Sequence, residues 1–107
     1  MVLNLARNNV GDIGTAALAE EISSCSRLQK LYLYENSIAD IGASALGEIV
    51  KTCASLYELF IWDNLFGEKG AKDLRIALKC RQDVYPDANV HIRSSWKQEG
   101  IVAQANV

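Results

Sequence analysis

Three cysteines and one histidine are the side chains of this sequence that could bind a metal ion or act as nucleophile and base. Cys25, Cys53 and Cys80 stand far apart at nearly equal intervals, with no CxxC pair and no histidine at ligand spacing. Zinc sites use short, paired spacings of such ligands. The sequence therefore predicts no zinc site and no cofactor. An odd number of cysteines also argues against a disulfide framework, so we expect buried, reduced thiols in a cytoplasmic protein.

Catalytic motifs give no stronger signal. His91 lies in no recognisable arrangement with a nucleophile or carboxylate, and the chain has no GxSxG, Walker or HExxH motif. A single histidine near the end of a chain of this kind is typical of a surface residue. We therefore predict that the chain is not an enzyme.

Composition and charge limit the possible partners. The 107 residues fit one small domain, and with 50% hydrophobic and 22% charged residues the composition is that of a globular chain. The formal net charge is −2 and no run of lysine or arginine is present, whereas nucleic acids and anionic membranes select basic patches. No apolar run reaches the roughly 18–20 residues of a membrane span. We expect neither a nucleic acid nor a membrane as the partner.

An internal repeat organises the sequence. Between positions 3 and 28, eleven residues recur 28 positions later: Leu3, Leu5, Asn8, Asp12, Ile13, Gly14, Ala17, Leu18, Glu20, Cys25 and Leu28. A second shift by the same interval reaches Leu59, Ile61, Asn64, Gly70 and Leu74. A period in the range of about 20–50 residues is the signature of stacked structural units.

Each unit divides into a strand segment and a helix segment. The strand segments are LQKLYLYENSI (28–38) and LYELFIWDNLF (56–66). The helices are expected from Asp12 to Ser24 and from Asp40 to Thr52, with Asp12 and Asp40 as caps. Their apolar stripes are predicted at Ile13, Ala17, Leu18 and Ile22, and at Ile41, Ala45, Leu46, Ile49 and Val50. Asn8, Asn36 and Asn64 are expected to satisfy turn backbone groups.

The strand segments resemble the leucine-rich repeat motif LxxLxLxxNxL, and NSIADIGASALGEIV (36–50) is similar to the ribonuclease-inhibitor-like class, which includes NOD-like receptors and Ran GTPase-activating proteins. The resemblance implies an α/β leucine-rich repeat solenoid, a right-handed superhelix with a parallel concave sheet and helices on the convex side. It would span 1–93, with repeats at about 1–27, 28–55 and 56–86, a terminal strand at 89–93, and a tail or cap at 94–107. In that cap, Ser95 and Gln98 have capping-box spacing.

In this class the residues between the leucines point outward from the concave sheet. With Val90 placed in the position that corresponds to Leu59, one column reads Asn4, Tyr32, Phe60, His91 and the next reads Ala6, Tyr34, Trp62, Arg93. Aromatic and arginine side chains dominate the energetics of protein interfaces. The predicted partner-binding residues are Tyr32, Tyr34, Glu35, Glu58, Phe60, Trp62, Asp63, His91 and Arg93, and the acidic ones are expected to select lysine or arginine in the partner.

Four alternatives to the binding of another protein remain open. The aromatic side chains could pack on one another across the strands. The chain could be an architectural segment of a larger protein, or form a homo-oligomer through an N-terminal edge that carries no polar cap. The resemblance also implies a less favoured GTPase-activating role, in which Arg7 would face a phosphate group.

Overall fold

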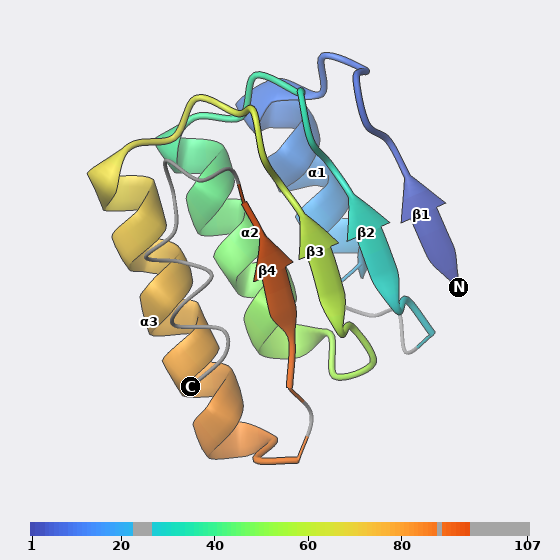
Figure 1. The fold of residues 1–107 in the computed structure, drawn as a ribbon, viewed down its shortest axis with the longest axis vertical. Helices are drawn as coiled ribbons and strands as arrows, with labels where there is room; N and C mark the ends of the chain where they lie inside the picture. The colour runs from blue at the N-terminus through green and yellow to red at the C-terminus, as the bar shows by residue number, and fades with distance from the viewer. Residues whose placement is uncertain (23–26, 88, 95–107) are drawn as a thin grey trace.

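The computed structural model describes residues 1–22, 27–87 and 89–94, in which strands alternate with helices (Figure 1). The elements in chain order are β1 (Val2–Asn4), α1 (Gly11–Ile22), β2 (Lys30–Tyr32), α2 (Asp40–Thr52), β3 (Glu58–Phe60), α3 (Glu68–Val84) and β4 (His91–Arg93). The expected α/β class is confirmed. The predictions for Cys25 and for a cap helix after residue 94 lie outside the described residues.

The four strands form one parallel sheet in the order β1-β2-β3-β4, and the helices lie side by side on one of its faces (Figure 1). Parallel neighbours that follow one another in sequence need a crossover, and each helix supplies one. The opposite face, which the helices do not cover, is called the outward face below. It carries the side chains that alternate with the buried leucines.

The register of the first three strands follows the interval of the sequence repeat, whereas that of β4 does not. Leu3 pairs with Leu31, and Leu31 pairs with Leu59, as predicted. Leu59 then pairs with Ile92 and not with Val90, so β4 is shifted by two positions from its predicted place. The predicted columns are therefore wrong at β4. The cause is α3, which has 17 residues where α1 has 12 and α2 has 13.

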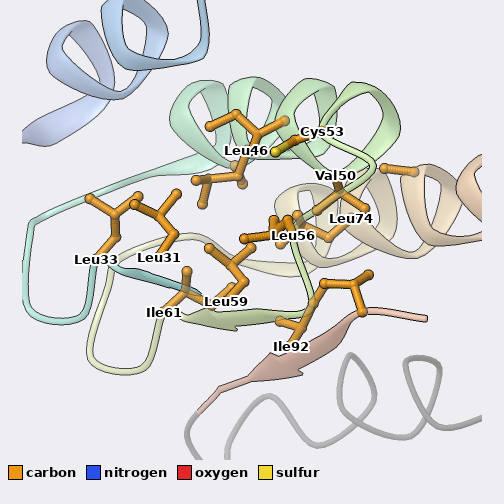
Figure 2. Close-up of a cluster of buried hydrophobic side chains, with 14 of the residues drawn as sticks. Leu31, Leu33, Leu46, Val50, Cys53, Leu56, Leu59, Ile61, Leu74 and Ile92 are labelled. Atoms are coloured by element: carbon orange, nitrogen blue, oxygen red, sulfur yellow. The ribbon is translucent and has the colours of Figure 1, made fainter. Parts of the chain in front are cut away.

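The core lies between the sheet and the helices, and leucines and isoleucines of both layers fill it (Figure 2). Leu31, Leu33, Leu59 and Ile61 are fully buried, as the repeat predicts. From the helical side, Leu46, Val50, Cys53 and Leu74 pack against them.

The buried faces of the helices differ from the predicted stripes. Ile13 is 89% exposed and Ile41 is 75% exposed, so neither belongs to the core. In α2 the buried face is instead Gly42, Ala43, Leu46, Gly47, Ile49 and Val50. Small residues allow neighbouring helices to approach closely. A Cβ at Gly42 would stand 2.5 Å from Oδ1 and 3.3 Å from Cα of Asp12 in the neighbouring helix α1.

The aspartates at the helix starts cap the following helix and not their own, which corrects the prediction. Asp12 Oδ1 accepts hydrogen bonds from the backbone N–H of Ala39 (2.7 Å) and Gly42 (3.0 Å) at the start of α2. Asp40 Oδ1 accepts from Gly67 (2.8 Å) and Gly70 (3.0 Å) at the start of α3. Each carboxylate therefore satisfies two of the donors that a helix start leaves unpaired, and joins consecutive units.

The asparagines at the strand ends have the expected structural role. Asn36 Oδ1 accepts from the N–H of Asn8 (2.9 Å) and Val10 (3.1 Å), and its Nδ2 donates to the Leu5 carbonyl (2.8 Å). Asn64 repeats this pattern one unit later, where it accepts from Asn36 and Ile38 and donates to Leu33.

Arg81 is a buried arginine that the sequence did not indicate as structural. Its guanidinium donates to the carbonyls of Val50 (2.8 Å), Cys53 (2.7 Å), Ala54 (3.0 Å) and Leu56 (2.6 Å). These carbonyls lie at the C-terminal end of α2 and in the loop before β3, where a positive charge is favoured. Burial lowers the pKa of this guanidinium. Arg81 therefore anchors α3 to the preceding unit.

Replacement of Leu33 by Ala should lower the free energy of unfolding by about 2–5 kcal/mol, because it removes buried methyl groups and leaves a cavity. Ile13→Ala is the matched control, since Ile13 is exposed, and it should change stability by less than about 0.5 kcal/mol. Chemical denaturation of both variants measures the difference. Equal costs for the two substitutions would contradict the core described here.

Replacement of Asp40 by Ala should destabilise the chain by about 0.5–2 kcal/mol, the usual range for loss of an N-terminal helix cap. The loss should appear in α3, because the amide protons of Gly67 and Gly70 lose their acceptor. Hydrogen exchange at these two amides is the measurement, and Asp87→Ala, an exposed aspartate, is the control. Faster exchange in α2 alone would mean that Asp40 caps its own helix.

Candidate functional site

Four aromatic side chains gather on the outward face of β2, β3 and the residues that follow these strands. Tyr32 stacks on Phe60 with ring centroids 4.2 Å apart and planes 2° apart. Tyr34 stacks on Trp62 at 4.3 Å and 16°. Phe60 and Trp62 meet edge to face at 5.8 Å and 85°. These four residues are called the aromatic cluster below.

The register explains why the cluster forms. Tyr32 and Phe60 are partners in the pairing of β2 with β3, and hydrogen bonds from Leu33 to Phe60 and from Glu35 to Trp62 continue this pairing beyond the strands. Side chains at equal positions of parallel neighbours therefore stand side by side. The stacked ring faces cover one another, as one of the alternatives predicts. All four side chains are nevertheless only half-buried, so the cluster remains accessible.

Two cations and one carboxylate border the cluster: Lys30 and Glu58 begin β2 and β3, and the side chain of Arg93, at the end of β4, reaches back to Glu58. Glu58 lies 3.3 Å from Lys30 Nζ and accepts a hydrogen bond from Arg93 Nε at 3.2 Å. Burial alone would raise the pKa of Glu58, but the hydrogen bonds and charges of Arg93 and Lys30 outweigh it and lower the pKa. The hydrogen bond with Glu58 likewise raises the pKa of Lys30. The negative charge of Glu58 is therefore already balanced by two cations of the same chain.

The opposite border, at the C-terminal ends of the strands, carries Arg7, Glu35 and Asp63. Arg7 forms an ion pair with Glu35, and its guanidinium lies 5.5 Å from the centre of the Tyr34 ring. All three residues adopt left-handed backbone conformations, with φ between 55° and 60°, which non-glycine residues rarely do. Asp63 is exposed, and its carboxylate has no ion-pair or hydrogen-bond partner among the described residues.

The correction at β4 moves two predicted site residues relative to the cluster. Arg93 pairs with Phe60 and not with Trp62, and His91 pairs with Glu58 and not with Phe60. Both remain on the outward side of β4, because Ile92 between them is buried. The structure thus keeps the predicted strand residues on the outward face in a different arrangement, with Glu35 and Asp63 in the segments that follow β2 and β3. Sequence reasoning missed Tyr57, whose ring lies 5.7 Å from Lys30 Nζ.

The other chemical expectations concern thiols, metals and membranes. Cys53 is buried, as predicted, whereas Cys80 is half-buried, and no disulfide joins the two. Within residues 1–22, 27–87 and 89–94, no group of three or more histidine, cysteine or acidic side chains could hold a metal ion. Over the same ranges no helix has both the length and the apolar character needed to cross a membrane.

Comparison with known proteins gives no identification: no protein-family model and no curated protein matches the chain.

The ion pairs of Glu58 predict a dependence of stability on pH. The pKa of Glu58 is lower in the folded chain than in the unfolded chain, where glutamate titrates at about pH 4.3. The stabilisation is present above that pH and is lost as the pH falls through the folded pKa. Glu58→Gln should remove this component, about 0.2–1 kcal/mol for solvent-screened pairs. Urea denaturation between neutral and acidic pH measures it. An unchanged acid dependence in the variant would contradict the assignment.

Proposed function

We propose that the chain is a leucine-rich repeat segment of the ribonuclease-inhibitor-like class, with its strands on the concave side of a solenoid. The support is that the same hydrogen bonds recur at the interval of the sequence repeat. Asn36 and Asn64 bind equivalent backbone groups, and Asp12 and Asp40 cap equivalent helix starts. Repeated contacts between neighbours are the basis of solenoid architecture.

The proposed function is protein binding through the aromatic cluster and its charged borders, in a cytoplasmic protein. The observation that carries it is the position of four half-buried aromatic side chains on the sheet face that the helices leave uncovered. Such contiguous surfaces usually mark partner sites, and aromatic anchors supply large contact area at a low entropic cost.

An architectural or self-associating role is the second candidate, and two observations favour it. The aromatic side chains stack on each other, which gives them a structural contribution of their own. Met1 and Val2 are 56% and 55% exposed at β1, which is an edge strand of the sheet that the described residues form. The GTPase-activating role has less support, because Arg7 is engaged with Glu35 and Tyr34.

Trp62→Ala separates these functions. We expect it to lower the free energy of unfolding by about 1–3 kcal/mol, the value of the two aromatic pairs that Trp62 forms with Tyr34 and Phe60. Binding to a partner should weaken by about 2 kcal/mol or more, as for central aromatic anchors. This loss corresponds to roughly thirtyfold in affinity. Affinity capture with the folded chain identifies candidate partners, and titration with each purified partner measures the loss.

The matched control is Glu20→Ala, on the exposed side of α1, which should leave partner binding unchanged. Unfolding of the Trp62→Ala variant would show that the cluster is structural. A change confined to the molar mass in solution would show that the chain binds to itself.

A further inference from the structure

The two borders of the aromatic cluster carry opposite excess charge. Around Glu58, which begins β3, Lys30 and the side chain of Arg93 share a single carboxylate, which leaves one formal positive charge. At the C-terminal ends, Arg7 is paired with Glu35, and the exposed Asp63 adds a carboxylate with no partner among the described residues, which leaves one formal negative charge. The outward face is therefore polarised along the strand direction, although the whole chain is close to neutral.

The dimensions of this surface suit a single segment of chain. The aromatic side chains occupy only two neighbouring strands, which are about 5 Å apart, so the apolar strip is narrow. Its length from Glu58 to Asp63 is roughly 17 Å, at about 3.3 Å per residue. A stable dimer of folded chains usually buries about 1,200–2,000 Å². A narrow strip with charged ends offers much less apolar area to a second copy of the chain.

Extending the proposed protein-binding function, we infer that the outward face takes an extended segment of another protein with charged residues of opposite sign at its two ends. A lysine or arginine of that segment lies beside Asp63 and Glu35, where the carboxylate of Asp63 gains its partner. Apolar side chains cover Trp62 and Phe60. An aspartate or glutamate lies beside Arg93 and Lys30. The charged residues of the segment are about four to six positions apart, because an extended chain advances about 3.3 Å per residue.

This inference differs from the sequence-based expectation in the role of the acidic residues. According to that expectation, Glu58, Glu35 and Asp63 all attract basic groups of the partner. Glu58 is instead covered by two cations of the chain itself, so that end of the face attracts an acidic group. Among these three carboxylates, Asp63 combines exposure with the lack of a partner among the described residues.

Selection from a random peptide library tests the inference with the chain as it exists. Phage-displayed peptides of about 12 residues are long enough to span the roughly 17 Å strip with flanking residues. Selection on the wild-type chain should enrich peptides with a basic residue, an apolar centre and an acidic residue at the stated spacing. Selection on Asp63→Lys should lose the basic residue, and selection on Arg93→Gln should lose the acidic one.

Affinities of a selected peptide provide the quantitative measurement. Asp63→Lys should weaken its binding about tenfold, because a like charge then opposes the basic end of the peptide. Added salt should reduce the affinity for the wild type. Glu20→Lys makes a comparable charge reversal on α1, away from the strip, and should leave the affinity unchanged. Circular dichroism of each variant establishes that the fold is retained.

Each result has a separate meaning. The inference would be overturned if the enriched peptides depend on Trp62 but show no preference for charged residues. It would also be overturned if Asp63→Lys leaves their charge preference unchanged. In both cases the proposed protein-binding function would stand. Loss of all Trp62-dependent enrichment would overturn the proposed function as well. Sedimentation velocity showing a dimer of the wild type that Asp63→Lys dissociates would identify a second copy as the occupant, and would also overturn the inference.

Discussion

The backbone groups at the end of each strand need hydrogen-bond partners, and the side-chain amides of Asn36 and Asn64 provide them. Each amide binds the turn of the preceding unit through its oxygen and a strand-end carbonyl of that unit through its nitrogen. An unpaired buried backbone group costs about as much as a lost hydrogen bond. These amides therefore hold consecutive units in one register, which aligns the leucines inside and the aromatic side chains outside.

The C-terminal end of α2 shows how the same requirement is met with different chemistry. The carbonyl of Leu28 accepts a hydrogen bond from the Ser55 hydroxyl at 2.7 Å. The equivalent carbonyl one unit later, that of Leu56, is bound by Arg81, which stands 28 positions after Cys53. An arginine offers five donors where a thiol offers one weak donor. Arg81 can therefore satisfy four carbonyls and hold the longer helix α3 in place.

The period of the sequence predicted the register of β1, β2 and β3, the buried leucines and the stacking partners of the aromatic side chains. It failed where the period is interrupted, since the extra residues of α3 shift β4 and exchange the neighbours of His91 and Arg93. The prediction that Ile13 and Ile41 are buried was also wrong. A sequence period gives the spacing of apolar residues, but it does not show which face of a helix packs. In α2 that face contains the small residues Gly42 and Ala43. The ion pair of Glu58 with Lys30 lies in the predicted register, whereas its second ion pair, with Arg93, depends on the β4 shift and could not be anticipated.

The caps at the helix starts have a consequence for synthesis of the chain. Asp12 and Asp40 each come earlier in the sequence than the helix start that they cap, by a whole unit. A polypeptide leaves the ribosome N-terminus first and folds as it emerges. Each new helix therefore finds its capping carboxylate already made and mounted on the unit before it. For these two caps, the acceptor is therefore synthesised before the donors that it binds.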